Sequence, residues 1–376
     1  PSQQESILKP AGWMHYRYPF IYGQPDTRQF PLATWRSAAN WLHGGVRDPA
    51  WVIDHIDQDV PMLIEQIRTR VLPKRGIVAA PDEILITLGS QNALYLLTRL
   101  LLSSTTRIGV ENPCFREAIN TFLLADAEVV PHPVDEEGIV LNERPCDYYY
   151  VTPGHQVPTG VTMSSARRRQ LLEHAARHDA VIIEDDYDSE SNFTLNPLPA
   201  LKASDRSGRV VYVSSLSKAL SPGLRLGFMV ADPDLIDEAR ALRRLVYRHP
   251  PTNIQYQMAH FLAQGHYETH LRRYHYDSAQ RWERLHAALQ RYLPSCRALA
   301  GSEHANAFWL QTPAQINTQQ LTWRAAHAGV LIEPGARHFL NAAPPDNYFR
   351  MGFHAINPDA IAQGVEVLRG QLEQMG

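Results

Sequence analysis

One lysine, Lys218, lies in residues 211–227 (VYVSSLSKALSPGLRLG), where an apolar run gives way to small hydroxylated residues and a Pro-Gly pair. The pattern predicts a buried strand that ends in a loop and holds the lysine. A lysine forms a Schiff base with an aldehyde only when its amine can lose a proton, which burial beside other cations favours. Ser215, Ser217 and Arg225 would supply hydroxyls and a fixed cation to a phosphate. The aldehyde that carries a phosphate is pyridoxal 5′-phosphate (PLP).

An acidic cluster follows an apolar run in residues 182–190 (IIEDDYDSE). A parallel strand ends in this way at its carboxyl edge, where open α/β sheets bind their ligands. A PLP site needs one carboxylate against the pyridine nitrogen, because only the protonated ring withdraws electrons from a substrate carbanion. We assign that role to Asp185 and expect Tyr187 to hydrogen-bond the ring's phenolic oxygen. The alternatives are a solvated strand end or a metal-binding cluster of Glu184, Asp185 and Asp186.

A third segment, residues 84–102 (ILITLGSQNALYLLTRLLL), joins a short β-like run to an apolar pattern with helical spacing. The turn between them would aim free backbone N–H groups and the positive end of a helix dipole at a phosphate. We expect Ser90 and Gln91 to contact that phosphate. A glycine and a serine before a helix are also an ordinary N-cap, so this motif has weight only together with the other two.

Five segments in this order carry a family resemblance: LITLGSQNAL, ENPCF, VTPGHQVPTGVTMS, IIEDDYDSE and SSLSKALSPGLRLG. The chain resembles the fold-type I PLP enzymes of the aspartate aminotransferase superfamily and, more closely, the aminotransferase-like domain of MocR/GabR-type bacterial regulators. The resemblance implies that Lys218 is the Schiff-base lysine, that Phe115 stacks on the cofactor ring and that Arg225 joins the phosphate site. It also implies that Arg350, in YFRMGFH, clamps a substrate carboxylate, which suits a planar bidentate donor.

Several positions depart from the family pattern. The Asn-Pro-Thr-Gly motif reads Val-Pro-Thr-Gly at residues 157–160, which leaves Tyr187 to contact the phenolic oxygen alone. Residues 51–62 lack the tyrosine and glycine pattern that brings a phosphate contact from the neighbouring subunit, and Phe115 offers the substrate no hydroxyl. His155 lies in a loop expected to reach the cofactor edge. It would stack on or hydrogen-bond the ring there, although ordering of the loop is an equally good interpretation.

The composition indicates a cytoplasmic protein without a metal site. The chain has 376 residues, of which 44% are hydrophobic, enough for a large core in more than one lobe. A net charge of −3 gives no broad basic surface for nucleic acid or an anionic membrane. Three scattered cysteines form neither a disulfide framework nor a zinc site, and no apolar run could span a membrane. His266 and His270 have metal-pair spacing, but a helix surface is the better interpretation because no third ligand is evident.

The chemical motifs need an α/β frame, and the chain supplies one. Short β-like runs at residues 84–87, 107–111, 127–134, 148–152, 180–185, 209–213 and 225–231 alternate with helical segments. This alternation predicts a mainly parallel seven-stranded sheet flanked by helices. We expect three parts: an N-terminal segment (1–45) that packs on the small lobe, a large PLP-binding domain (46–280) and a small α+β domain (281–376). Strands are expected in the last part at 307–311, 330–333 and 348–353.

Two functions remain open at this stage, and both use PLP. The favoured one is an effector-sensing domain that forms an external aldimine with an amino acid or amine and belongs to a MocR/GabR-type regulator. The resemblance implies a homodimer and a winged-helix DNA-binding head that this chain does not contain, so we expect no DNA contact by the chain itself. The alternative is a free-standing aminotransferase with an amino acid donor. A scaffold that has lost PLP is disfavoured because Lys218, Asp185 and Arg225 are all present.

Overall fold

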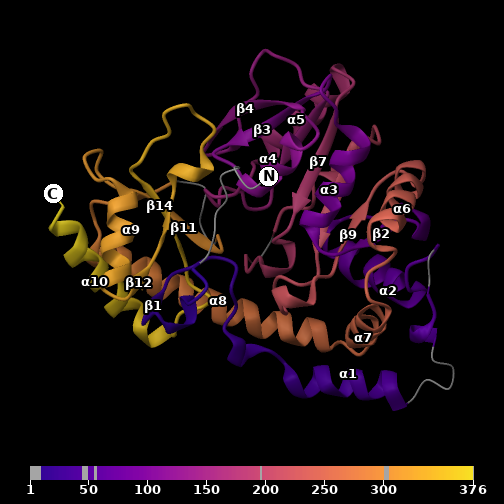
Figure 1. Ribbon diagram of the computed structural model, residues 1–376, viewed down its shortest axis with the longest axis horizontal. Coiled ribbons are helices and arrows are strands. Elements are labelled where there is room, and N and C mark those ends of the chain that lie inside the picture. The colour runs from indigo at the N-terminus through magenta and orange to yellow at the C-terminus, as the bar shows by residue number, and fades with distance from the viewer. Residues whose placement is uncertain (1–9, 45–49, 55–56, 195–196, 300–304, 376) are drawn as a thin grey trace.

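The structure, a computed structural model, describes residues 10–44, 50–54, 57–194, 197–299 and 305–375. A large sheet covered by helices lies beside a smaller antiparallel sheet, and the long helix α8 runs from one to the other (Figure 1). The described helices are α1 (Leu32–Gly44), α2 (Pro61–Gln66), α3 (Ser90–Leu101), α4 (Arg116–Leu123), α5 (Ser165–Arg177), α6 (Pro233–Tyr247), α7 (Thr252–Ala263), α8 (His266–Tyr292), α9 (Thr318–His327) and α10 (Ile361–Glu373).

The large sheet confirms the predicted mainly parallel α/β fold. Its strand order is β2-β9-β8-β7-β6-β3-β4-β5. The strands are β2 (Ile84–Thr87), β3 (Arg107–Asn112), β4 (Glu128–Asp135), β5 (Gly138–Ile139), β6 (Tyr148–Val151), β7 (Val181–Asp186), β8 (Val210–Ser215) and β9 (Gly227–Val230). Neighbours from β8 to β4 are parallel, whereas β9 is antiparallel to β2 and β8. The seven predicted strands are present, and the eighth, β5, is a two-residue partner of β4, too short to produce a periodic pattern.

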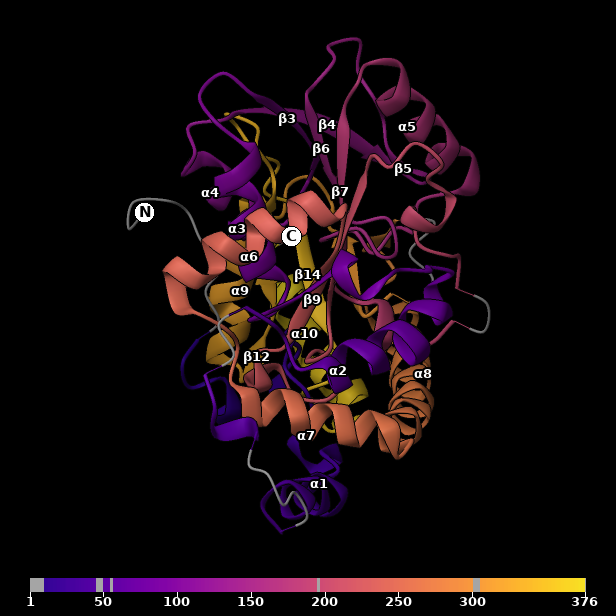
Figure 2. The ribbon, with the colours of Figure 1, turned by 90° about the vertical axis from the view of Figure 1, so that its right-hand side faces the viewer.

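Alternate residues of the central strands enter two different hydrophobic cores. On β8, Tyr212 packs in the core that contains α2 and α7, while Val211 and Val213 pack in the core that contains α3, α4 and α6. Figure 2 shows α3, α4 and α6 on one side of the strands and α2 and α5 on the other. Parallel strands covered on both faces need apolar residues at nearly every position, which explains the continuous apolar runs in the sequence.

The smaller sheet has the order β10-β11-β14-β13, all antiparallel. Its strands are β10 (Arg297–Ala298), β11 (Ala307–Gln311), β13 (Glu333–Pro334) and β14 (Tyr348–Gly352). The single strand predicted at 330–333 is divided: β12 (Val330–Leu331) pairs with β1 (Tyr18–Pro19), and β13 pairs with β14. The chain leaves one sheet and joins another at Ile332, a change that apolar periodicity does not reveal.

The N-terminal segment divides its contacts between the two lobes. We expected all of residues 1–45 to pack on the smaller lobe, and β1 does pair with β12 there. Helix α1 instead packs against α7, where the Trp35 ring meets the Phe261 ring edge-on with centroids 5.4 Å apart. An amphipathic helix requires an apolar surface, but its own sequence does not specify which one. Residues 1–9 and 45 lie outside the described part, and the domain boundaries stay predictions.

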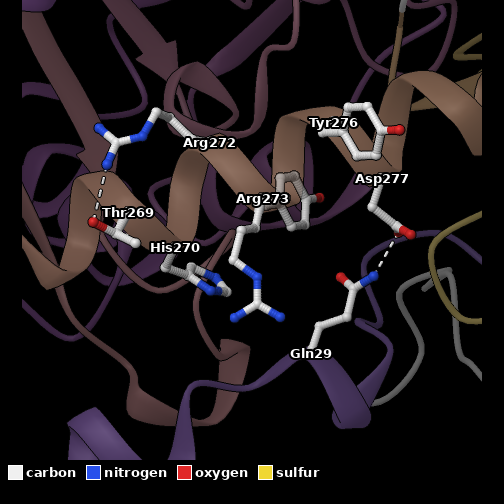
Figure 3. Close-up of a pocket in the computed structure, with 8 residues that line it drawn as sticks. Gln29, Thr269, His270, Arg272, Arg273, Tyr276 and Asp277 are labelled. Carbon is white, nitrogen blue, oxygen red and sulfur yellow. Dashed lines mark hydrogen bonds between the residues drawn. The ribbon is translucent and has the colours of Figure 1, made fainter.

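Between β1 and α1 the segment crosses α8. Gln29 donates there to the carboxylate of Asp277, beside a surface hollow of about 420 Å³ that Arg273 also lines (Figure 3). His270 does not lie on a helix surface, in contrast to the interpretation from the sequence: its side chain is buried, and its Nε2 lies 2.8 Å from the carbonyl oxygen of Ala219. The described residues hold no group of three or more His, Cys, Asp or Glu side chains that could bind a metal ion. None of the described helices is long and apolar enough to cross a membrane.

Candidate functional site

A cavity of about 340 Å³ lies at the carboxyl edge of the large sheet, where that edge faces the smaller sheet. Its walls come from the ends of β7 and β8, the start of α3, the N-terminal segment and strands β13 and β14. The predicted site residues that line it are Ser90, Gln91, Phe115, Asp185, Tyr187, Ser215, Ser217, Lys218, Arg225 and Arg350. The tertiary structure therefore brings together residues from five separate sequence segments.

Lys218 lies three residues after β8 and faces two tyrosines. Its Nζ donates a short hydrogen bond to the hydroxyl of Tyr22 and lies 4.0 Å from the centroid of the Tyr187 ring. Burial raises the pKa of Tyr22 and of Tyr187 well above the ordinary value, so both phenols keep their protons. The sequence analysis missed Tyr22 because it comes from the N-terminal segment, 196 residues before the lysine.

One end of the cavity suits a phosphate. Helix α3 begins at Ser90 with its N-terminus at the cavity, and Gly89 precedes it with a φ of 87°. A Cβ at Gly89 would lie 2.7 Å from Nη2 of Arg225, which donates to the carbonyl of Leu88. Glycine is therefore required both by the backbone and by the approach of the guanidinium. Ser217 plays a different part, because its hydroxyl already bonds the N–H and C=O of Leu226.

Asp185, at the end of β7, presents one free oxygen to the cavity. Its Oδ2 accepts a 2.9 Å hydrogen bond from the hydroxyl of Tyr150, and Oδ1 is buried with no partner among the described residues. Burial raises the pKa of the carboxyl to about 7, against the lowering effects of the Tyr150 hydrogen bond and the Lys218 charge. Tyr150 lies in β6, and the sequence analysis did not identify it because an apolar strand offers many tyrosines of equal appearance.

The two neighbouring acids have structural partners instead. Glu184 accepts the backbone N–H groups of Leu201 and Lys202, while Asp186 accepts hydrogen bonds from Arg75 and Tyr212. Successive side chains of a strand point to opposite faces, so these two acids cannot turn to the side that Asp185 occupies. The metal-cluster interpretation is thereby disfavoured.

These features fit PLP. The unpartnered Oδ1 of Asp185 is the acceptor that a protonated ring nitrogen needs, and the α3 N-terminus with Arg225 offers a cradle for the phosphate. Phe115, which the resemblance places on the cofactor ring, lines the same cavity. Beside it, burial raises the pKa of the Cys114 thiol to about 12, so this cysteine is not a nucleophile.

Arg350, on β14, forms the opposite end of the cavity. It is 5% exposed, and its guanidinium carbon lies 3.6 Å from the centroid of the Tyr22 ring. Nη1 lies 3.9 Å from Oε1 of Glu333, and Nε has no hydrogen-bond partner among the described residues. A buried guanidinium with donors to spare can accept the acid group of a ligand.

His155 does not line the cavity, in contrast to the expectation that it reaches the cofactor edge. Its ring is buried, with Nδ1 2.9 Å from Oδ2 of Asp188, and its backbone oxygen accepts the Tyr187 hydroxyl at 3.1 Å. This placement favours the loop-ordering interpretation. The hydroxyl of Tyr187 is engaged here, so its contact with the phenolic oxygen stays a prediction. Val157 lines the cavity where the family has asparagine.

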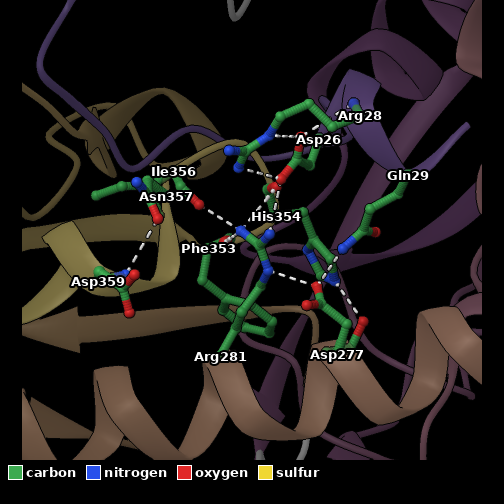
Figure 4. Close-up of polar contacts among 11 residues, drawn as sticks. Asp26, Arg28, Gln29, Asp277, Arg281, Phe353, His354, Ile356, Asn357 and Asp359 are labelled. Atoms are coloured by element: carbon green, nitrogen blue, oxygen red, sulfur yellow. Dashed lines mark hydrogen bonds and ion pairs between the residues drawn. The ribbon is translucent and has the colours of Figure 1, made fainter.

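A buried arginine holds the segment that carries Tyr22 (Figure 4). Arg281, in α8, has 2% of its side chain exposed and binds Asp26 at 2.9 Å and Asp277 at 2.5 Å. It also donates to the backbone carbonyls of Phe353, His354 and Ile356. One guanidinium thus ties the long helix, the N-terminal segment and the chain after β14 together.

Residues 51–62, which we expected to lack the pattern for a phosphate contact from a neighbouring subunit, are only partly described, since residues 55–56 lie outside the described part. Within this stretch, Asp59 forms a buried ion pair with Arg243 at 2.6 Å and accepts the N–H of Ile86. These contacts anchor the stretch to the large sheet.

Comparison with known proteins agrees with this site. The family described as "Aminotransferase class I and II" matches residues 57–367. The HTH-type transcriptional regulator TauR of Rhodobacter capsulatus is 39% identical over 93% of this chain and 72% of its own length. The probable rhizopine catabolism regulatory protein MocR of Rhizobium meliloti is 33% identical over 94% and 72%. Among solved structures, Pyrococcus horikoshii kynurenine aminotransferase, in complex with PMP, has a TM-score of 0.86 at 26% identity, covering 94% of this chain and 90% of that one.

Proposed function

The chain belongs to the family of class I and II aminotransferases, and on this premise we propose that it is the effector-sensing part of a MocR/GabR-type transcriptional regulator. Its cofactor is PLP. The ligand is an amino acid or another small amine. The observation that carries the proposal is the single cavity in which Lys218, the unpartnered oxygen of Asp185 and Arg350 meet.

PLP supplies an aldehyde for an amine and a ring that withdraws electrons from the carbon beside that amine. Lys218 would hold the cofactor through its amine, and the same amine could move a proton at the carbon of a bound ligand. Asp185 would keep the ring nitrogen protonated through Oδ1, while Tyr150 holds Oδ2. Phe115, which lines the cavity, would cover the ring and exclude water from its face.

The two ends of the cavity, one at the N-terminus of α3 and the other at Arg350, determine how the ligand is oriented. Ser90, Gln91, Ser215 and Arg225 bind the phosphate, with Ser217 fixing the loop behind them. At the other end, Arg350 binds the acid group. Lys218 Nζ and the Arg350 guanidinium carbon lie 4.2 Å and 3.6 Å from the centroid of the same Tyr22 ring, so they are less than about 8 Å apart. A ligand with its amine and its acid group a few bonds apart spans this distance.

Two observations help to distinguish a sensor domain from a catalytic aminotransferase. The regulators TauR and MocR are 39% and 33% identical to the chain, whereas the kynurenine aminotransferase is 26% identical. The alternative, a free-standing aminotransferase, is supported by the TM-score of 0.86 to that enzyme and by the presence of each group that transamination requires. We favour the sensor because identity to the regulator TauR, 39% over 93% of the chain, exceeds identity to that enzyme, 26% over 94%.

We further propose a cytoplasmic homodimer. The described cysteines, Cys114, Cys146 and Cys296, are free thiols, which suits a reducing compartment. At the end of α6, the apolar side chains of Leu245 and Val246 are 81% and 51% exposed, and a second copy would cover them. Sedimentation at micromolar concentration with PLP bound tests the dimer, and a monomer there would refute it.

The decisive experiment is a spectral screen of the PLP-loaded protein with amines and amino acids. Ligands should change the visible absorbance of the bound cofactor, and borohydride treatment of the ligand-free protein should fix the cofactor on the peptide that contains Lys218. A Lys218→Ala variant that still yields a borohydride-fixed cofactor would refute the lysine assignment. Release of a keto acid at about one turnover per second or faster would favour the enzyme over the sensor.

A further inference from the structure

Beside Arg350, the same cavity is lined by a second pair of ionisable side chains, Glu333 and His338. Glu333 lies on β13, directly opposite Arg350 in the sheet, and His338 follows five residues later. The Nε2 atom of His338 lies 2.9 Å from Oε1 of Glu333, the same oxygen that lies 3.9 Å from Nη1 of Arg350. His338 is 1% exposed, so this contact is sheltered from water.

The hydrogen bonds of His338 determine how many protons the pair holds. Its Nδ1 lies 2.9 Å from the backbone carbonyl of Cys114, which can only accept, so Nδ1 carries a proton. A neutral imidazole has no second N–H, and its bare Nε2 would then face the Glu333 oxygen with two lone pairs opposed. One additional proton resolves this conflict. The Arg350 guanidinium favours the carboxylate form of Glu333, which places that proton on His338.

The protonated pair changes what Arg350 can bind. If His338 were neutral, the Glu333 carboxylate at 3.9 Å would compete with a ligand's acid group for the guanidinium. When His338 carries the proton, the pair is neutral as a unit and the positive charge of Arg350 remains available. Groups near the pair include the Trp309 ring, edge-on to the His338 ring with centroids 5.5 Å apart, the buried Cys114 thiol, and Glu117, which lines the same cavity from α4.

We propose that Glu333 and His338 are specificity-determining residues of the ligand site, because the proton on His338 keeps Glu333 from neutralising Arg350 and so selects ligands with an anionic group. This inference rests on the proposed function, in which Arg350 binds the acid group of an amino ligand. It adds two residues that the sequence analysis did not identify and assigns them an effect on ligand charge, not on the cofactor.

Ligand binding tests the proposal with the PLP-loaded protein and three probes: L-alanine and β-alanine, which carry an acid group, and ethylamine, which does not. Visible absorbance of the bound cofactor reports binding. His338→Gln, which keeps a donor but no charge, should weaken both acid probes roughly tenfold or more and ethylamine much less. Adding Glu333→Gln to His338→Gln should restore most of that loss, because no carboxylate then competes for Arg350. A double variant as weak as His338→Gln, or an equal loss for ethylamine, would overturn the proposal.

A ligand-independent measurement addresses the proton itself. Nitrogen-15 spectra of the histidine rings in the PLP-loaded protein identify the His338 signals by their absence in His338→Gln. Both ring nitrogens should bind a proton at pH 7, and Nε2 should lose its proton in Glu333→Gln. A bare Nε2 in the parent protein would refute the inference whatever the probes do. A parent protein that responds to none of the three amines would count against the proposed ligand class, and the nitrogen spectra would still decide the proton.

Discussion

Replacement of Tyr150 by phenylalanine removes one hydroxyl and with it the only hydrogen bond that the Asp185 side chain makes to another described side chain. The bond measures 2.9 Å between Tyr150 Oη and Asp185 Oδ2, and both residues are almost completely buried. In the variant Oδ2 loses its side-chain donor, and Oδ1 has none in either protein. The ionised form of Asp185 should therefore become less stable, and the pKa of its carboxyl should rise.

The size of the effect follows from the hydrogen bond. A hydrogen bond to a charged group stabilises by about 1.5–3 kcal/mol, and 1.36 kcal/mol corresponds to one pKa unit. The pKa of Asp185 without cofactor, about 7, should thus rise by roughly 1–2 units in Tyr150→Phe. PLP binding requires the ionised carboxylate against the ring nitrogen, so affinity for PLP should fall roughly 10- to 100-fold at pH 6. At pH values above the raised pKa, Asp185 is ionised in both proteins and the difference should shrink.

Fluorescence titration of the apoprotein with PLP at pH 6 and at pH 9 measures this effect. Tyr149→Phe is the matched control, because Tyr149 lies next in β6, is equally buried, and bonds Cys146 and His174 away from the cavity. Both variants should lose stability, by about 1.5–3 kcal/mol where Tyr150 bonds the charged Asp185 and by about 1 kcal/mol for each of the two hydrogen bonds of Tyr149. The reasoning would be refuted by a Tyr150→Phe affinity within twofold of the parent at pH 6, or by an equal loss in Tyr149→Phe.

Three further outcomes are expected. Gly89→Ala should weaken PLP binding, because the new Cβ would lie 2.7 Å from Nη2 of Arg225 and the φ of residue 89 is 87°. Gly370→Ala in α10, which has open space around it, should leave PLP binding unchanged, and PLP titration compares the two variants. Arg281→Met should destabilise the protein by about 3–5 kcal/mol, since a buried ion pair loses one partner. Urea unfolding measures this loss of stability, and a loss under about 1 kcal/mol would contradict the prediction. The bonds from Arg28 and Arg281 lower the pKa of Asp26 to about 2, so its stabilisation is present above pH 4 and lost as the pH falls through about 2. Unfolding curves of the parent and Asp26→Asn should converge over that range.

The sequence alone determined the local structure and the residues whose surroundings are local. Apolar runs that end in polar residues predicted the strands, because a strand covered on both faces has to be apolar along its length. Lys218 and Asp185 were identifiable because each follows such a run directly, at the edge where parallel strands present their ends. Gly89 and Ser90 were identifiable for the same reason, as the turn between a strand and a helix.

Only the tertiary structure decided the partners of these residues. Tyr22 reaches Lys218 across 196 positions and His338 reaches Cys114 across 224, and nothing near either residue in the sequence marks such a contact. Tyr150 differs from its neighbour Tyr149 only in which face of β6 it occupies. Helix α1 packs against α7, and His155 lies outside the cavity, because the packing of whole elements determines which surfaces are in contact. Local sequence specifies what a residue can do chemically, while the long-range arrangement of the chain specifies what it is placed against.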